Sequence, residues 1–289
     1  MQPSALAPAA VARASTPAPS SSSSPRRGRG RRRAARRAGL GALGIVLFVG
    51  VWQLVPTAGL LDGRYFPPPT AVLPRLATDL GDLEFWRNIR RTMSTWAIGL
   101  VVATSAATVL ATVIGLVPFL RSATHTTVEF LRPIPSVALI PLCVLVFGIQ
   151  PQAALVIIVF ASFWQVFVQV LYGVADVDSV ARDTARSFGL GRWSRVRHLV
   201  LPTALPYLMT GVRLAAAVAL ILAITAEMFI GNPGLGRALI FAQSAGDYPQ
   251  VYALVIATGL LGLGVNLVFR LVERRALSWH QSVRGEEVP

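Results

Sequence analysis

The chain of 289 residues contains no lysine, one cysteine and few charged residues. All 27 basic side chains are arginines, so a phosphate-binding Walker lysine and a Schiff-base lysine are both absent from this chain. Cys143 alone gives no disulfide framework and no cysteine-based metal site, and the three scattered histidines suggest no metal centre. We therefore expect no catalytic residue, cofactor or metal here, and any ATP chemistry would belong to another subunit.

The composition is that of a membrane protein. Hydrophobic residues make up 54% of the chain and charged residues only 14%, with a mean hydropathy of +0.59, which is too apolar for a soluble domain of this length. Several apolar runs are long enough to cross a bilayer. The sequence predicts an all-α polytopic protein with six transmembrane helices, at residues 39–55, 93–120, 132–147, 153–172, 203–230 and 252–271.

The net charge of +14 is concentrated at the start of the chain, where nine arginines precede Leu40 without one acidic residue. Residues 1–38 are otherwise mostly Ala, Pro and Ser, and we expect a disordered cytoplasmic tail that binds anionic membrane lipid rather than nucleic acid. A secretory signal peptide is the competing interpretation, but no clean A-x-A cleavage site follows the apolar run. A second tail is expected at residues 281–289.

The other arginines set the expected orientation. Twenty of the 27 fall in segments expected to be cytosolic, including Arg121 and Arg132. This distribution predicts that both termini lie on the cytosolic side of the cytoplasmic membrane. A brief polar turn is expected around Arg121 and His125. The segment 56–91 should be external, with a short amphipathic helix at 71–80, and residues 231–247 should form a second external loop.

Few residues within the predicted spans are polar or break a helix. Pro133, Pro135 and Pro141 should kink or unwind the third span, which places it beside a pathway or only marks a packing kink. Gln165 and Gln169 form a polar stripe that could face the pathway or bond another helix. Glu227, deep in the fifth span, is interpreted as a gate, interhelix or pathway contact, and Arg213 as a snorkelling structural residue.

One long polar stretch, residues 176–206, separates the fourth and fifth spans on the cytosolic side. Acidic residues precede a predicted helix at 179–188, and Gly189 should end it in the left-handed conformation. A second, basic helix at 193–200 then leads to Pro202 and the next span. We interpret the stretch as a contact surface for a cytosolic partner, although an ordinary positively charged loop would share these features.

This stretch resembles the EAA signature of permease subunits in binding-protein-dependent ABC importers. The motif spacing matches throughout, with Asp in place of Glu and Thr in place of the first Ala: Asp183, Thr184, Ala185, Gly189, Leu199, Leu201 and Pro202. Other stretches, among them Phe66–Thr70, Leu131–Pro135, Phe147–Ile149 and Ala226–Glu227, look like the aliphatic sulfonate, taurine and nitrate branch.

The resemblance implies a type I ABC importer permease fold over residues 39–280, with a coupling loop at 174–202. It implies a homodimer, two cytoplasmic ATPase subunits and an extracytoplasmic substrate-binding protein. ATP hydrolysis on the partner would drive the import of a small anionic solute through the coupling helix. An ion-coupled secondary transporter is the alternative, and it gives no reason for the EAA spacing; a membrane-embedded enzyme would need a catalytic cluster that the spans lack.

Overall fold

The computed structural model describes residues 27–277, with side chains from Gly39 onward, and every regular element in that range is helical. The chain divides into two compact units, residues 1–51 and 52–289, which are described separately. The expected tail at 281–289 and the tail residues 1–26 lie outside the described range.

The first unit contains most of helix α1 (Arg27–Thr57). Residues 27–38 are helical although the sequence predicts a disordered tail to residue 38, and the reason is local. Ala and Arg are strong helix formers, and no proline interrupts them there. From Gly39 to Thr57 the helix is apolar enough to cross a membrane, and its large side chains are exposed, as lipid-facing positions should be.

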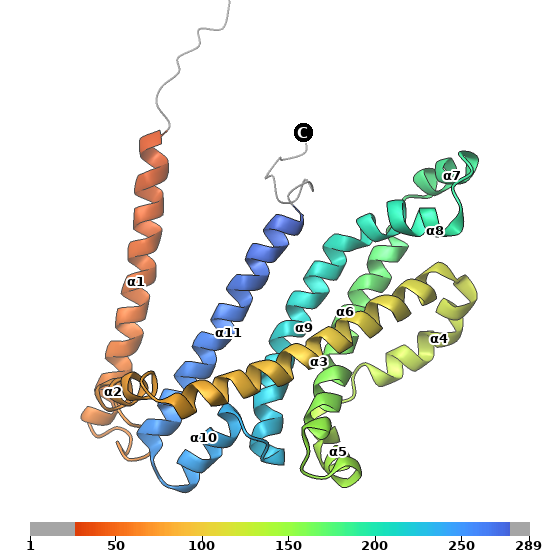
Figure 1. Ribbon diagram of the computed structural model, residues 1–289. Helices are drawn as coiled ribbons and strands as arrows, with labels where there is room; N and C mark the ends of the chain where they lie inside the picture. The colour runs from red at the N-terminus through yellow and green to blue at the C-terminus, as the bar shows by residue number, and fades with distance from the viewer. Residues whose placement is uncertain (1–26, 278–289) are drawn as a thin grey trace, which may run out of the picture. The chain divides into compact units, whose positions relative to one another are not determined.

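The second unit is a bundle of long helices joined by short ones (Figure 1). Four helices here are long and apolar enough to cross a membrane, in addition to the apolar part of α1. One bent pair of helices gives a sixth span if the pair is counted as a single span. The elements are α2 (Pro69–Asp79), α3 (Leu83–Leu116), α4 (Pro118–Leu131), η1 (Ser136–Leu139), α5 (Ile140–Phe147), α6 (Pro151–Ala175), α7 (Ser179–Ser187), α8 (Arg192–Arg195), η2 (Val196–Val200), α9 (Leu201–Ile230), α10 (Leu235–Ser244) and α11 (Tyr248–Ala276).

Glycine contacts fix the relative direction of α3 and α6. Gly99 on α3 packs against Ile158 on α6, and Gly115 packs against Val174 further along both helices. The two helices therefore run parallel, and the segment between them must return across the membrane. That segment is the bent pair α4 and η1–α5, whose halves meet at 81°. The pair is thus one broken span, and the second unit has five crossings.

The remaining long helices alternate in direction around a core of small residues. Gly173 on α6 meets the backbone of Ala204 and the ring of Tyr207 on α9, while Gly211 meets Gln165 and Gln169, so α6 and α9 are antiparallel. Close approach of this kind needs small residues at the contact. Larger side chains, Ile157, Ile158, Phe167 and Leu222 among them, complete the buried clusters.

Three boundaries differ from the sequence prediction. Arg121 and His125 lie on a helix of 14 residues, α4, and not in a turn, because Pro118 starts a helix and no Gly or Pro follows before Arg132. The external loop at 231–247 contains α10. The second helix of the cytosolic stretch runs without interruption from Arg192 to Ile230.

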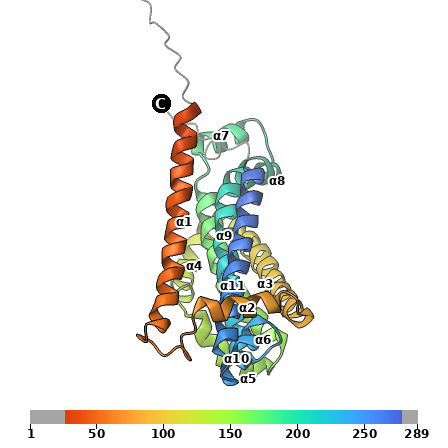
Figure 2. The same ribbon diagram turned by 90° about the vertical axis from the view of Figure 1, so that its left-hand side faces the viewer.

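The short helices mark the two ends of the bundle in the second unit. Both views show α7 and α8 at one end and α2, α5 and α10 at the other (Figures 1 and 2). At the α2 end, Arg75 pairs with Asp247 at 2.9 Å, and Gln250 donates to Asp79 at 2.7 Å. Burial raises the pKa of Asp79, and the hydrogen bond from Gln250 opposes that rise.

Candidate functional site

The segment between α6 and α9 carries the motif residues, and hydrogen bonds fix where it begins. Asp178 is the N-cap of α7, and its carboxylate accepts from the Val180 N–H at 2.9 Å. This bond satisfies a donor that the first turn of a helix leaves unpaired. The Tyr207 hydroxyl on α9 donates to the Asp176 carboxylate at 2.9 Å. The first bond caps α7, and the second connects the end of α6 to α9 just before α7 begins.

Gly189 ends α7 in a Schellman motif. The Leu190 N–H donates to the Ala185 carbonyl at 3.0 Å, and the Gly189 N–H donates to the Arg186 carbonyl at 2.9 Å. Gly189 has φ +70°, a left-handed conformation that costs glycine little and other residues more. The sequence-predicted end of the helix is confirmed, and the short helix is capped at both ends.

The outer surface of α7 and its flanks is unusually apolar for an exposed loop. Val180, Phe188 and Trp193 are 69%, 80% and 75% exposed. Asp183 is 71% exposed and lies 3.4 Å from Arg186, and Thr184 is exposed beside it. Exposed apolar groups rimmed by charged residues are typical of a protein interaction site. The arrangement suits a helix that inserts into a partner.

The later motif residues lie at the junction with α9. Leu199 packs against the main core cluster, whereas Leu201 is 41% exposed. The Leu201 N–H donates to the Val196 carbonyl five residues back, which makes η2 a π-helical turn. A wider turn accommodates Pro202, which has no N–H and would crowd a regular helix. The junction is therefore a continuous helix and not a break.

Glu227 is buried near the end of α9 opposite α7, one turn before the helix ends at Ile230. Its Oε2 atom accepts hydrogen bonds of 2.9 Å from the Thr92 hydroxyl of α3 and from the Gly236 N–H of α10. The Leu235 N–H in turn donates to the Thr92 hydroxyl at 3.0 Å. The sequence places Glu227 deep in a span, but the structure places it in a contact that joins three helices.

Arg213 has an acidic partner that sequence spacing alone did not indicate. Its Nη1 atom lies 2.9 Å from Glu273 Oε2, so the pair connects α9 to α11. The sequence offered no signal for this pair, because the two residues are 60 positions apart and Glu273 lies just beyond the predicted sixth span. Arg213 is thus a structural residue with a defined partner.

The predicted pathway residues in the third and fourth spans are divided between the helix break and the contact of α6 with α9. Pro135 caps η1 and Pro141 lies in the first turn of α5. Gln169 packs against Gly211, so it faces α9. Gln165 lines a small cavity of about 220 Å³ between the break, α6 and α9. The residues around that cavity are Arg132, Ser136, Val137, Ala161, Trp164, Gln165, Val218, Ile221 and Leu222.

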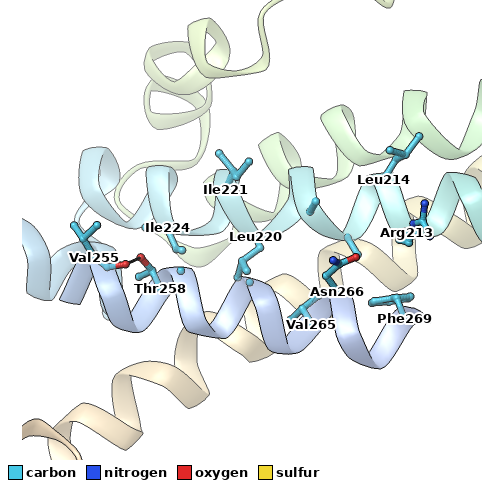
Figure 3. Close-up of a pocket in the computed structure, with 14 residues that line it drawn as sticks. Arg213, Leu214, Leu220, Ile221, Ile224, Val255, Thr258, Val265, Asn266 and Phe269 are labelled. Carbon is cyan, nitrogen blue, oxygen red and sulfur yellow. Dashed lines mark hydrogen bonds between the residues drawn. The ribbon is translucent and has the colours of Figure 1, made fainter. Parts of the chain in front are cut away.

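Two large cavities of the bundle are mainly apolar. One of about 660 Å³ lies between α9 and α11, with Arg213 and Phe269 at one end and Val255 and Thr258 at the other (Figure 3). Another of about 540 Å³ lies between α2, α3 and α11. The Arg213 charge is already paired with Glu273. Neither cavity presents a free charged group to a polar solute.

Comparisons with known proteins identify the type of chain to which these features belong. The family described as binding-protein-dependent transport system inner membrane component matches residues 99–278. The chain is 30% identical to the taurine transport system permease protein TauC of Escherichia coli (strain K12), over 85% of this chain and 90% of that protein. It is 30% identical to the aliphatic sulfonates transport permease protein SsuC of the same strain, over 83% and 91%. It is 25% identical to the nitrate import permease protein NrtB of Leptolyngbya laminosa, over 85% and 90%.

Solved structures share the fold. A chain of a bacterial ABC transporter involved in the import of the acidic polysaccharide alginate aligns with a TM-score of 0.60 at 18% identity, covering 85% of this chain and 99% of that one. A chain of the inward-facing MetNI methionine ABC transporter aligns with a TM-score of 0.57 at 17% identity, covering 66% and 94%. At these identities the likeness concerns the fold alone.

Proposed function

Because the chain belongs to the family of binding-protein-dependent transport system inner membrane components, the permease subunits of ABC importers, we propose that it imports a small anionic solute. The proposed solute is of the aliphatic sulfonate, taurine or nitrate type. Such a permease is a multi-pass protein of the inner membrane and is not itself catalytic. It works with an ATPase and a binding protein, and we further propose that it forms a homodimer with two ATPase subunits.

The observation that carries the coupling role is the exposed, doubly capped helix α7. A helix that transmits force must keep its shape when a partner moves it, and both ends of α7 are held by hydrogen bonds. Its apolar flanks and the motif residues Asp183 and Thr184 are open to a partner. We assign α7 as the helix that the ATPase grips.

Movement of α7 would pass directly into the membrane. The helix from Arg192 to Ile230 is continuous, so displacement at its cytosolic end would shift α9 as a rigid body. α9 contacts α3, α6 and α11 through the packed and polar contacts described above. Rigid-body rocking of such a bundle is a common way to alternate access to a central site.

The anionic class of solute rests on the relatives, which carry taurine, aliphatic sulfonate and nitrate transport in their names. The test is ATPase stimulation in proteoliposomes that contain the chain, its cognate ATPase and the binding protein. We expect stimulation with one or more of taurine, alkanesulfonates and nitrate. Stimulation by a sugar or a cation alone would overturn the anionic assignment, and activity without any ATPase would overturn the permease role.

A further inference from the structure

Arg132 lies at the middle of the membrane-spanning bundle, and not at its cytosolic surface as the sequence suggests. It follows the last residue of α4, at the break of the span formed by residues 118–147. The cavity that it borders is lined on α6 by residues 161–165, the centre of a helix that runs from 151 to 175. The α9 residues at the same cavity, 218–222, also lie well inside that helix.

A polar stripe on α4 connects this position with the α7 end of the bundle. Arg121, His125, Glu129 and Arg132 recur at helical spacing on one face, and all four are exposed. Charged side chains on a spanning helix are costly against lipid and normally face a watery cavity or protein. The stripe therefore marks a side of the broken span that faces water or protein and not lipid.

Arg132 forms no ion pair among the side chains that the structure describes. The acid nearest to it on α4, Glu129, lies 3.5 Å from His125 and does not border the cavity. The cavity lining contains no carboxylate. Its other polar groups are Ser136, Gln165 and Trp164, and the buried Trp164 indole N–H has no hydrogen-bond partner in the described part of the chain.

These groups match one kind of ligand. A cation, an amide and two hydrogen-bond donors suit a compact anion with several acceptor oxygens, such as a sulfonate, a carboxylate or nitrate. The apolar remainder of the lining, Val137, Ala161, Val218, Ile221 and Leu222, suits a short alkyl chain. The cavity volume of about 220 Å³ is below the roughly 300–1,000 Å³ of pockets that hold drug-sized ligands, so the cavity suits a smaller solute.

We propose that the cavity bordered by Arg132, Ser136, Trp164 and Gln165 is a mid-membrane site that holds the anionic group of the transported solute. Arg132 supplies the charge, and Gln165 supplies a directional hydrogen bond. This inference rests on the proposed function. It adds that the permease itself selects for negative charge, after the binding protein has delivered the solute.

The test uses the reconstituted complex of permease, ATPase and binding protein, with radiolabelled taurine or nitrate, whichever the wild-type complex imports. The measured quantity is the amount of solute imported per ATP hydrolysed. For Arg132→Gln we expect this ratio to fall by about tenfold to a hundredfold, the loss typical of one charge-assisted hydrogen bond. Arg132→Lys should recover part of it, because it restores the charge without the planar geometry.

Two further variants separate an anion site from a structural role. Gln165→Leu, a change inside a regular helix, should lower the same ratio, whereas Arg270→Gln, which removes an exposed arginine of α11 away from the cavity, should leave it unchanged. Wild-type ratios for both Arg132→Gln and Gln165→Leu would overturn the site. Equal losses in Arg132→Lys and Arg132→Gln, with lower thermal stability in both, would also overturn it by giving Arg132 a structural role. A wild-type complex that imports no anion would instead refute the proposed function.

Discussion

Glu227 is a buried carboxyl group whose Oε2 atom accepts two hydrogen bonds, while its Oε1 atom is buried without a partner among the described residues. Thr92 and Gly236 donate to it, so α3, α9 and α10 share one polar contact at the end of the bundle opposite α7. Gly234 and Gly236 pack so closely around this contact that a Cβ atom on either would overlap neighbouring atoms. Packing around Glu227 therefore explains why glycines stand at positions 234 and 236.

Replacing Glu227 should cost stability according to whether the new side chain can accept a hydrogen bond. Glu227→Leu leaves the Gly236 N–H and the Thr92 hydroxyl without their acceptor, and we expect a loss of about 1–3 kcal/mol in the free energy of unfolding. Glu227→Gln keeps an acceptor oxygen and should retain most stability and uptake. Thermal unfolding of the purified protein and uptake in proteoliposomes measure the two effects.

Thr225→Val provides the matched control, because the Thr225 hydroxyl bonds only to the Ile221 carbonyl of its own helix. It should unfold at nearly the wild-type temperature. Loss of uptake by Glu227→Gln at unchanged stability would give the carboxylate a role in transport beyond packing.

Helix α7 combines a fixed shape with an open surface, and each property can be tested alone. The shape depends on Gly189, whose left-handed φ of +70° and N–H donor end the helix. The surface depends on residues such as Asp183 that make no buried contact with the rest of the chain. Variants of these two positions should therefore fail in different ways.

Gly189→Pro should abolish uptake without reducing the amount of protein in the membrane. Proline fixes φ near −65° and lacks the N–H that bonds to Arg186, so the end of α7 cannot form. Gly191→Ala is the control, since Gly191 has φ −59° and open space around it. Immunoblots of membrane fractions and solute uptake give the comparison; wild-type uptake in Gly189→Pro would remove α7 from the coupling step.

Asp183→Arg should abolish ATPase-coupled uptake while the protein unfolds at the wild-type temperature, because the side chain is 71% exposed. Asp183→Glu, which restores the acid usual in the EAA pattern, should retain uptake. The measurement is uptake together with co-purification of the ATPase. Full activity of Asp183→Arg would show that this face of α7 does not meet the partner.

The whole bundle has a defined topology because α3 and α6 are parallel. The broken span must then cross the membrane, and α7 and α10 must lie on opposite sides of it. The alternative, a re-entrant hairpin at 118–147, would place α7 outside the cell.

Cysteine labelling in intact cells distinguishes these arrangements. Cys143 is buried and is the only cysteine, so Cys143→Ala gives a background free of thiols. We expect a membrane-impermeant maleimide to label Ser244→Cys on α10 and not Ser187→Cys on α7. Labelling of Ser187→Cys from outside would contradict the six-span topology.

Local features were predictable from the sequence. Hydropathy identified the five spans that are single helices, because each contains a continuous apolar run. The acidic N-terminus and Gly189 located α7, because capping involves neighbouring residues. The polar residues on one face of α4 lowered its average hydropathy, so that helix was predicted as a turn.

The sequence by itself determined that this chain is a helical membrane protein with a short capped helix between the fourth and fifth spans, and its motif spacing indicated the permease family. Only the tertiary structure decided that α3 and α6 are parallel, that Glu227 bonds to Thr92, and that Arg132 lies beside the middle of α6 and α9. The physical reason is the range of the interactions. Hydropathy and capping act within one or two helical turns, whereas these placements depend on packing between residues that are far apart in the chain.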